Sequence, residues 1–123
     1  MSNFVVGIYF SAHWCGPCRN FTPLLAEKYL KAVTGGNPFE IIFVSSDRDA
    51  SSFAEYYAEM PWLTLDFGDR STKEELSELF GVEGIPTLVL VNDAGLVNGD
   101  ACEAVASLPF EEWANSGDSD DEE

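Results

Sequence analysis

Basic residues are scarce in this sequence. Six Lys and Arg residues stand against 22 Asp and Glu, which gives a formal net charge of −16 at pH 7. Nucleic acids and anionic membrane surfaces attract proteins through clustered positive charge, so we expect neither as a direct partner. Part of the negative charge lies in residues 116–123, where acidic residues are interleaved with serine. We expect this segment to be an acidic, disordered tail.

Long apolar runs are missing as well. No run approaches the ~20 apolar residues that a transmembrane helix needs. Residues 4–10 are apolar, but no Lys or Arg precedes them, so they do not look like a secretory signal. Three cysteines are too few for a disulfide scaffold, which suits a reducing compartment. We therefore expect a cytoplasmic protein, with the nucleus as the alternative compartment, and no membrane partner.

The remaining composition is that of a globular domain. Of 123 residues, 46% are hydrophobic and 13% aromatic, which is enough to bury one core. We expect a single domain over residues 1–115, followed by the acidic tail.

Two of the three cysteines lie close together, in the segment Trp14-Cys15-Gly16-Pro17-Cys18. The run before them, residues 4–10, is short and rich in β-branched and aromatic residues, which predicts a buried strand. Apolar residues after the motif recur at helical spacing. They are Phe21, Leu24, Leu25, Tyr29 and Ala32. The pattern places Cys15 at a strand-to-helix junction.

A helix N-terminus favours a thiolate at Cys15, because its first N–H groups have no partner within the helix and its dipole is positive. The dipole alone contributes about 0.3–2 kcal/mol, so we also expect a hydrogen bond from the N–H or S–H of Cys18. The two-residue spacer lets Cys18 reach back and close a disulfide with Cys15. This arrangement indicates redox chemistry.

Other uses of the Cys-x-x-Cys spacing fit less well. A tetrahedral zinc site needs two more ligands, and the chain offers only Cys102 and His13, so we expect no metal. Attachment of c-type haem requires His where Arg19 stands. A structural disulfide stays open as an alternative. We interpret Cys102 as a buried or incidental thiol.

The rest of the chain alternates strands with helices. Pro23 lies within the helix after the motif and either kinks it or marks a fresh start capped by Thr22. Loop 45–49 is expected at the same sheet edge as the dithiol, where it is either a substrate-facing loop or an ordinary polar loop. The other expected elements are strand 39–44, helix 51–60, a short strand or extended segment over 62–67, a helix opened by a Thr72–Glu75 capping box and closed by Gly81, strand 88–91, an antiparallel return over 96–98, and one or two short helices over 100–107 and 110–114.

These segments together resemble the thioredoxin superfamily. The resemblance rests on Trp14-Cys15-Gly16-Pro17-Cys18 and Gly84-Ile85-Pro86-Thr87. Further segments are similar to the nucleoredoxin and tryparedoxin branch. They are Tyr9-Phe10-Ser11-Ala12-His13-Trp14-Cys15, Cys18-Arg19-Asn20-Phe21-Thr22-Pro23, Val44-Ser45-Ser46-Asp47, Tyr56-Tyr57-Ala58-Glu59-Met60-Pro61-Trp62-Leu63 and Phe80-Gly81-Val82-Glu83-Gly84-Ile85-Pro86-Thr87-Leu88.

The resemblance implies an α/β protein of thioredoxin-like fold, with a central mixed β-sheet flanked by helices. It implies that Cys15 is the attacking thiolate and Cys18 the resolving thiol. It also implies that Trp14 is the surface tryptophan that covers the site, and that Trp14, Gly16 and Pro17 contact the substrate. Pro86 is cis and packed against the dithiol, and the backbone of Ile85 pairs with a substrate chain. Trp62, which its residues alone favour as a core residue, becomes a substrate-side candidate.

The chain departs from its relatives in several places. An amino-terminal hairpin found in them is missing, and Gly16 stands where the branch usually carries Pro. Tyr9 occupies the position of the buried acid of ordinary thioredoxins, so another group has to accept the proton of Cys18. Glu83 or a water is our candidate, with a solvated surface glutamate as the alternative reading.

The sequence thus predicts a thiol–disulfide oxidoreductase that reduces protein disulfides and needs no cofactor. An external thiol or a flavoenzyme would return the pair to the dithiol. The alternative is a redox-regulated protein-binding module of a signalling pathway.

Overall fold

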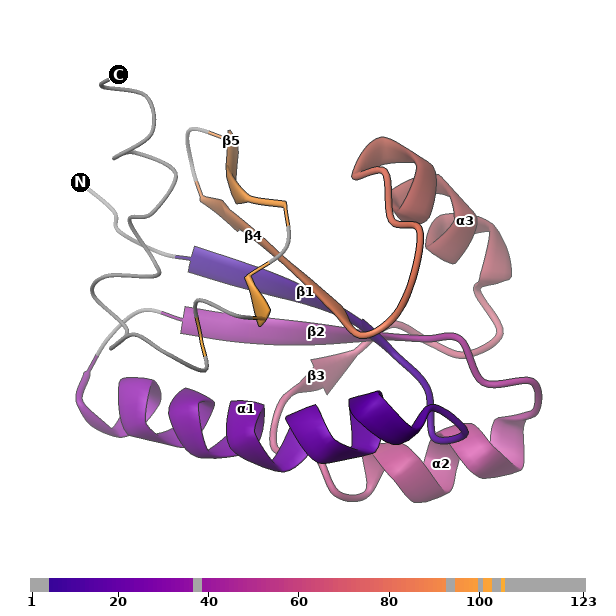
Figure 1. Ribbon diagram of the computed structural model, residues 1–123, viewed down its shortest axis with the longest axis horizontal. Helices are drawn as coiled ribbons and strands as arrows, with labels where there is room; N and C mark the ends of the chain where they lie inside the picture. Colours follow the sequence, from indigo (N-terminus) through magenta and orange to yellow (C-terminus); the bar gives the residue numbers. More distant parts are fainter. Residues whose placement is uncertain (1–4, 37–38, 93–94, 100, 103–104, 106–123) are drawn as a thin grey trace.

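A five-stranded mixed sheet forms the centre of the structure, with helices on both faces (Figure 1). The computed structural model describes residues 5–36, 39–92, 95–99, 101, 102 and 105. The strands are β1 (Val5–Ser11), β2 (Phe39–Ser45), β3 (Leu63–Thr64), β4 (Thr87–Asn92) and β5 (Gly95–Asn98). This sheet confirms the expected fold class.

The strand order is β3-β2-β1-β4-β5. Strands β1, β2 and β3 run parallel, while β4 is antiparallel to β1 and to β5. In the register of β1 with β2, Ser11 lies opposite Ser45. Both strands therefore end at the same level, so the loops that follow them meet at one edge of the sheet, as predicted.

Helices α1 (Gly16–Thr34) and α2 (Ala50–Tyr57) cover one face, and α3 (Arg70–Leu79) covers the other (Figure 1). Alternation along the strands divides the core between these faces. Tyr9 and Phe43 pack with side chains of α1 and α2, whereas their neighbours Phe10 and Val44 pack with side chains of α3. The central strands are thus buried on both sides, as their near-continuous apolar sequences predict.

Helix α1 passes through Pro23 as one element. The alternative of a fresh helix start at Pro23 is therefore wrong. The helix ends at Gly35 and Gly36, and Gly36 has a φ of 87°, a conformation that glycine adopts without steric cost.

The predicted start of α3 needs a correction. The helix is capped by Asp69, whose carboxylate accepts the backbone N–H of Thr72 at 3.2 Å and its hydroxyl at 2.8 Å. A side chain that caps from three residues upstream starts the helix earlier than the Thr72–Glu75 pair suggested. The predicted helix end at Gly81 is right, since this residue has a φ of 64° just after the cap.

The extended segment 62–67 contributes only the two residues of β3 to the sheet. Strand β5 pairs antiparallel with β4, which confirms the predicted return. The expected helix over 110–114 and the acidic tail lie outside the described residues, as does most of 100–107. Within the described part of the chain, no helix has the length and apolar character needed to cross a membrane.

Candidate active site

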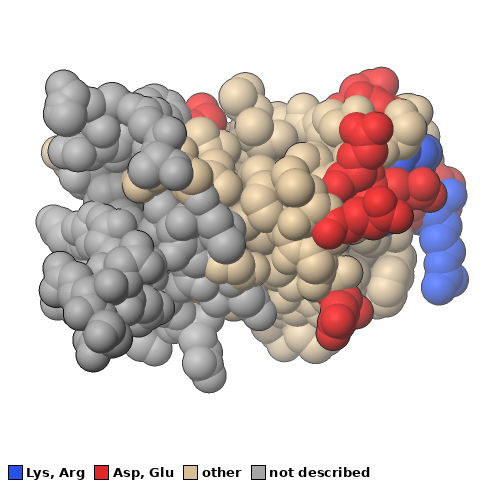
Figure 2. Space-filling view, turned by 90° about the horizontal axis from the view of Figure 1, so that it is seen from above, with Lys and Arg blue, Asp and Glu red and all other residues tan. Residues whose placement is uncertain are grey.

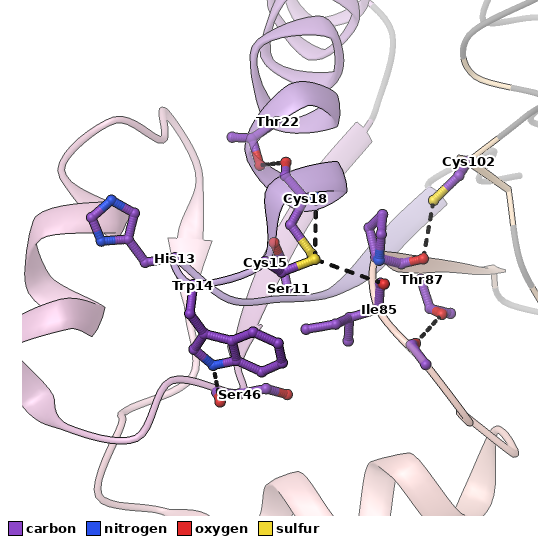
Figure 3. The surroundings of a disulfide bond; sticks show 12 residues. Ser11, His13, Trp14, Cys15, Cys18, Thr22, Ser46, Ile85, Thr87 and Cys102 are labelled. Atoms are coloured by element: carbon purple, nitrogen blue, oxygen red, sulfur yellow. Dashed lines mark hydrogen bonds between the residues drawn. A yellow bond between two sulfur atoms is a disulfide. The ribbon is translucent and has the colours of Figure 1, made fainter.

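Cys15 and Cys18 form a disulfide at the N-terminus of α1 (Figure 3). Cys15 is the residue that caps the helix, and the backbone N–H of Cys18 donates to its Sγ at 3.3 Å. The Cys18 N–H is one of the two alternative donors to Cys15 that we expected from the sequence. Cys15 is 7% exposed and Cys18 is fully buried. Of the two cysteines, only Cys15 keeps any exposed surface.

The segment from Gly84 to Thr87 lies against the disulfide. The Ile85–Pro86 peptide bond is cis, which confirms what the resemblance implied. The carbonyl oxygen of Ile85 is 3.8 Å from Cys15 Sγ, and the Ile85 side chain packs with Ala12 and both cysteines. The Thr87 hydroxyl donates to the Gly84 carbonyl at 2.7 Å, which closes the turn before β4. Ile85 and Pro86 are therefore brought together with the dithiol.

Trp14 is the exposed aromatic residue of the site. Its side chain is 52% exposed, and its indole N–H donates to the Ser46 carbonyl at 3.1 Å (Figure 3). The Arg48 guanidinium lies 5.3 Å from the centre of the indole ring, within the range of a cation–π contact. These two contacts hold the indole in place, and about half of the side chain stays exposed. Its covering role stays a prediction. Gly16 is half-buried and Pro17 is exposed beside it.

Asp47 connects loop 45–49 to the cysteine motif. The residue is 4% exposed, and its carboxylate accepts the His13 backbone N–H and the Ser45 hydroxyl, each at 2.7 Å. A second bond joins the same two segments, from the Ser46 N–H to the Ser11 carbonyl at 2.9 Å. The loop therefore anchors the backbone just before Cys15, a role that neither sequence interpretation of the loop contained.

The substrate-side prediction for Trp62 is wrong. The side chain is 3% exposed and belongs to the main core, where it makes edge-on ring contacts with Tyr9 and Tyr29. A buried indole offers no surface to a partner, so the core interpretation, favoured by the residues alone, is right.

Glu83 is exposed beside the site rather than buried beneath it. It lines a groove of about 320 Å³ together with Trp14, Lys73 and Ile85. Figure 2 shows acidic side chains gathered toward the end of the molecule at which α3 lies. Ile85 belongs both to this groove and to the cluster around the disulfide, so the groove that Glu83 lines lies next to the cysteine pair.

The third cysteine, Cys102, contacts the cis-proline segment. Cys102 is half-buried, and its Sγ is 3.7 Å from the Pro86 carbonyl oxygen (Figure 3). Among the described residues, no cluster of three His, Cys, Asp or Glu side chains could hold a metal ion.

A buried network of hydroxyl groups lies behind Cys18 and was missed in the sequence. Thr22, Tyr56, Tyr9 and Ser11 make hydrogen bonds of 2.5–2.7 Å with one another. They come from α1, α2 and β1, and no local spacing links them, so only the fold reveals the network.

A Cys-x-x-Cys disulfide at a helix N-terminus, next to a cis-proline segment and at the edge of this mixed sheet, defines the class of thioredoxin-like dithiol proteins. A family model described as thioredoxin-like matches residues 3–97. The chain belongs to this thioredoxin-like family, in its nucleoredoxin and tryparedoxin branch.

Individual relatives from this branch are similar to the chain in sequence and in structure. Nucleoredoxin from Danio rerio is 50% identical over 90 residues, which cover 73% of this chain and 22% of the relative. Tryparedoxin from Trypanosoma brucei brucei is 53% identical over 95 residues, which cover 76% of this chain and 65% of the relative. The solved structure of tryparedoxin from Trypanosoma brucei has a TM-score of 0.79 at 44% identity, covering 85% of this chain and 73% of that one. The chain thus spans about a fifth of the length of the nucleoredoxins it matches.

Proposed function

We propose that this domain reduces disulfide bonds in other proteins through the Cys15–Cys18 pair. The observation that carries the proposal is the asymmetry of the pair. Cys15 keeps some exposed surface, caps a helix and accepts an N–H, whereas Cys18 is fully buried and bonded to it. This is the arrangement that an attacking thiolate and a resolving thiol require.

In the first step, the reduced Cys15 thiolate attacks one sulfur of the substrate disulfide. The substrate S–S bond breaks, its second sulfur leaves as a thiolate that takes a proton, and a mixed disulfide to Cys15 forms. The helix dipole and the Cys18 N–H favour the anionic form of Cys15.

In the second step, Cys18 loses its proton and attacks Cys15 Sγ. The mixed disulfide breaks, and the substrate leaves with both of its sulfurs reduced. The cysteine pair has then been oxidised by two electrons to the Cys15–Cys18 disulfide. An external thiol or a flavoenzyme then supplies two electrons and two protons to restore the dithiol. In this proposal, the substrate backbone pairs with Ile85 and Pro86, while Trp14, Gly16 and Pro17 contact the residues that flank its cysteine.

The proton of Cys18 passes to Glu83 in this proposal, directly or through water. Glu83→Gln removes the carboxylate without changing the shape of the side chain, so we expect slower disulfide reduction at neutral pH and a changed pH–rate profile. The drop should be about tenfold, less than a fully positioned base supplies, because water reaches the open groove and replaces part of the function. Glu78→Gln, on the exposed surface of α3, is the control. An unchanged profile for Glu83→Gln would remove Glu83 from the mechanism.

The function itself is tested with insulin as the probe disulfide and dithiothreitol as the reductant. The domain should accelerate insulin reduction in proportion to its concentration, because the Cys15 thiolate is a better nucleophile at neutral pH than the thiols of dithiothreitol. A rate equal to that of dithiothreitol alone would contradict the proposal and favour a binding module.

A further inference from the structure

Four buried hydroxyl groups form a hydrogen-bonded network that reaches the Cys18 carbonyl. Ser11, Tyr9, Tyr56 and Thr22 are each at most 2% exposed. Thr22 Oγ1 is 2.7 Å from the Tyr9 hydroxyl and 2.5 Å from that of Tyr56, and Ser11 Oγ is 2.7 Å from the Tyr56 hydroxyl. Thr22 is the centre of the network.

Each hydroxyl group has one proton to donate, and this fixes the direction of every hydrogen bond in the network. Thr22 has one hydroxyl proton and donates it to the Cys18 carbonyl, with an O···O distance of 2.9 Å. Both tyrosines must therefore donate to Thr22 Oγ1. Because the proton of Tyr56 is then used, Ser11 has to donate to Tyr56. All four protons point along the network toward the Cys18 carbonyl.

The turn that carries Cys18 needs this support. Pro23 has no N–H, so the Arg19 carbonyl lacks its normal helical donor one residue after Cys18. The network ties this turn to β1 through Tyr9 and Ser11, and to α2 through Tyr56. Cys18 is thus held at both of its peptide groups, its N–H by Cys15 Sγ and its carbonyl by Thr22.

The network works as a donor chain and not as a base. Burial raises the pKa of Tyr9 well above its usual value, with the neighbouring Tyr56 as a further cause. Both the Tyr9 proton and the direction of the chain therefore persist at neutral pH.

We propose that Thr22, supported by Tyr9 and Tyr56, is a positioning residue that holds Cys18 at the place from which it closes the disulfide with Cys15. The inference rests on the proposed thiol–disulfide chemistry. A fixed Cys18 has a high effective concentration beside Cys15, so closure of the disulfide is favoured over two separate thiols. A looser turn shifts this balance toward the dithiol.

The test is the equilibrium between the Cys15–Cys18 disulfide and a buffer of reduced and oxidised glutathione. Thr22→Val keeps the shape of the side chain but removes the donor to Cys18 and the acceptor of both tyrosines. We expect a shift of about tenfold toward the dithiol, which corresponds to a reduction potential about 30 mV less negative. Thr22→Ser restores the hydroxyl and should return the equilibrium to within about twofold of the wild-type value.

Thr64→Val is the matched control, since Thr64 lies in β3 and its hydroxyl donates to the Phe43 carbonyl of β2. It should leave the equilibrium unchanged. If Thr22→Val lowers the melting temperature of both redox forms equally and leaves the equilibrium within twofold, the network is structural only and the inference is wrong.

Two further results separate the possibilities. If Thr22→Val does not fold, Tyr56→Phe removes a single donor and should give a smaller shift in the same direction, whereas no shift would also overturn the inference. If the wild-type domain forms no reversible disulfide with the glutathione buffer, the proposed function itself fails.

Discussion

Cys18→Ser is expected to stop the reaction at its covalent intermediate. The variant keeps the attacking thiolate of Cys15 but lacks the thiol that releases the substrate, so a mixed disulfide should accumulate and survive electrophoresis without reductant. Turnover with insulin should fall by about 10³-fold or more, as is usual when an essential nucleophile is removed. The measurement is the fraction of domain found covalently bound to insulin.

The other two cysteines provide the controls. Cys15→Ser removes the attacking sulfur, so neither turnover nor adduct is expected. Cys102→Ser should behave like the wild-type protein, since Cys102 contacts the Pro86 carbonyl and takes no part in the Cys15–Cys18 disulfide. An adduct that forms in Cys15→Ser but not in Cys18→Ser would reverse the roles of the two thiols.

Asp47→Ala is expected to be the most damaging substitution outside the cysteine pair. It leaves the partly buried His13 N–H and the buried Ser45 hydroxyl without their acceptor, and hydrogen bonds to charged groups contribute about 1.5–3 kcal/mol each. Because the two bonds share one carboxylate, we expect a loss of about 3 kcal/mol in the free energy of unfolding. Disulfide reduction should slow about tenfold, since the loop that positions Trp14 and Cys15 loses its anchor.

Thermal unfolding and the insulin assay together check this prediction. Asp47→Asn keeps an acceptor oxygen for the His13 N–H and should cost less than half as much. Glu55→Ala, an exposed change on α2, should stay within about 0.5 kcal/mol of the wild-type protein. Wild-type stability and rate in Asp47→Ala would mean that the loop does not anchor the motif.

The strands, the helix that follows the motif and the dithiol could be predicted from the sequence, because each shows a pattern among residues that are close together in the chain. Residues 4–10 and 39–44 are apolar runs of strand length, and the Cys-x-x-Cys spacing lies directly at a helix start. Their parallel pairing followed from the single helix between them.

The remaining features depend on contacts between distant residues. Asp47 is one acid among 22, and only the register of β1 with β2 brings it to the His13 N–H. Trp62 follows a proline near the site in the sequence, yet packing against Tyr9 and Tyr29 buries it. Thr22 and Tyr56 are 34 residues apart, so the hydroxyl network leaves no periodic signal.

Ionisation of the Cys15 thiol in the reduced domain tests the central claim most directly. The rate of alkylation by iodoacetamide is measured against pH in a Cys102→Ser background, with the modified residue identified by mass spectrometry. The account predicts that Cys15 reacts before the buried Cys18 and that its pKa lies below the value of about 8.5 for a free thiol. A pKa for Cys15 at or above that value, or first modification at Cys18, would contradict it.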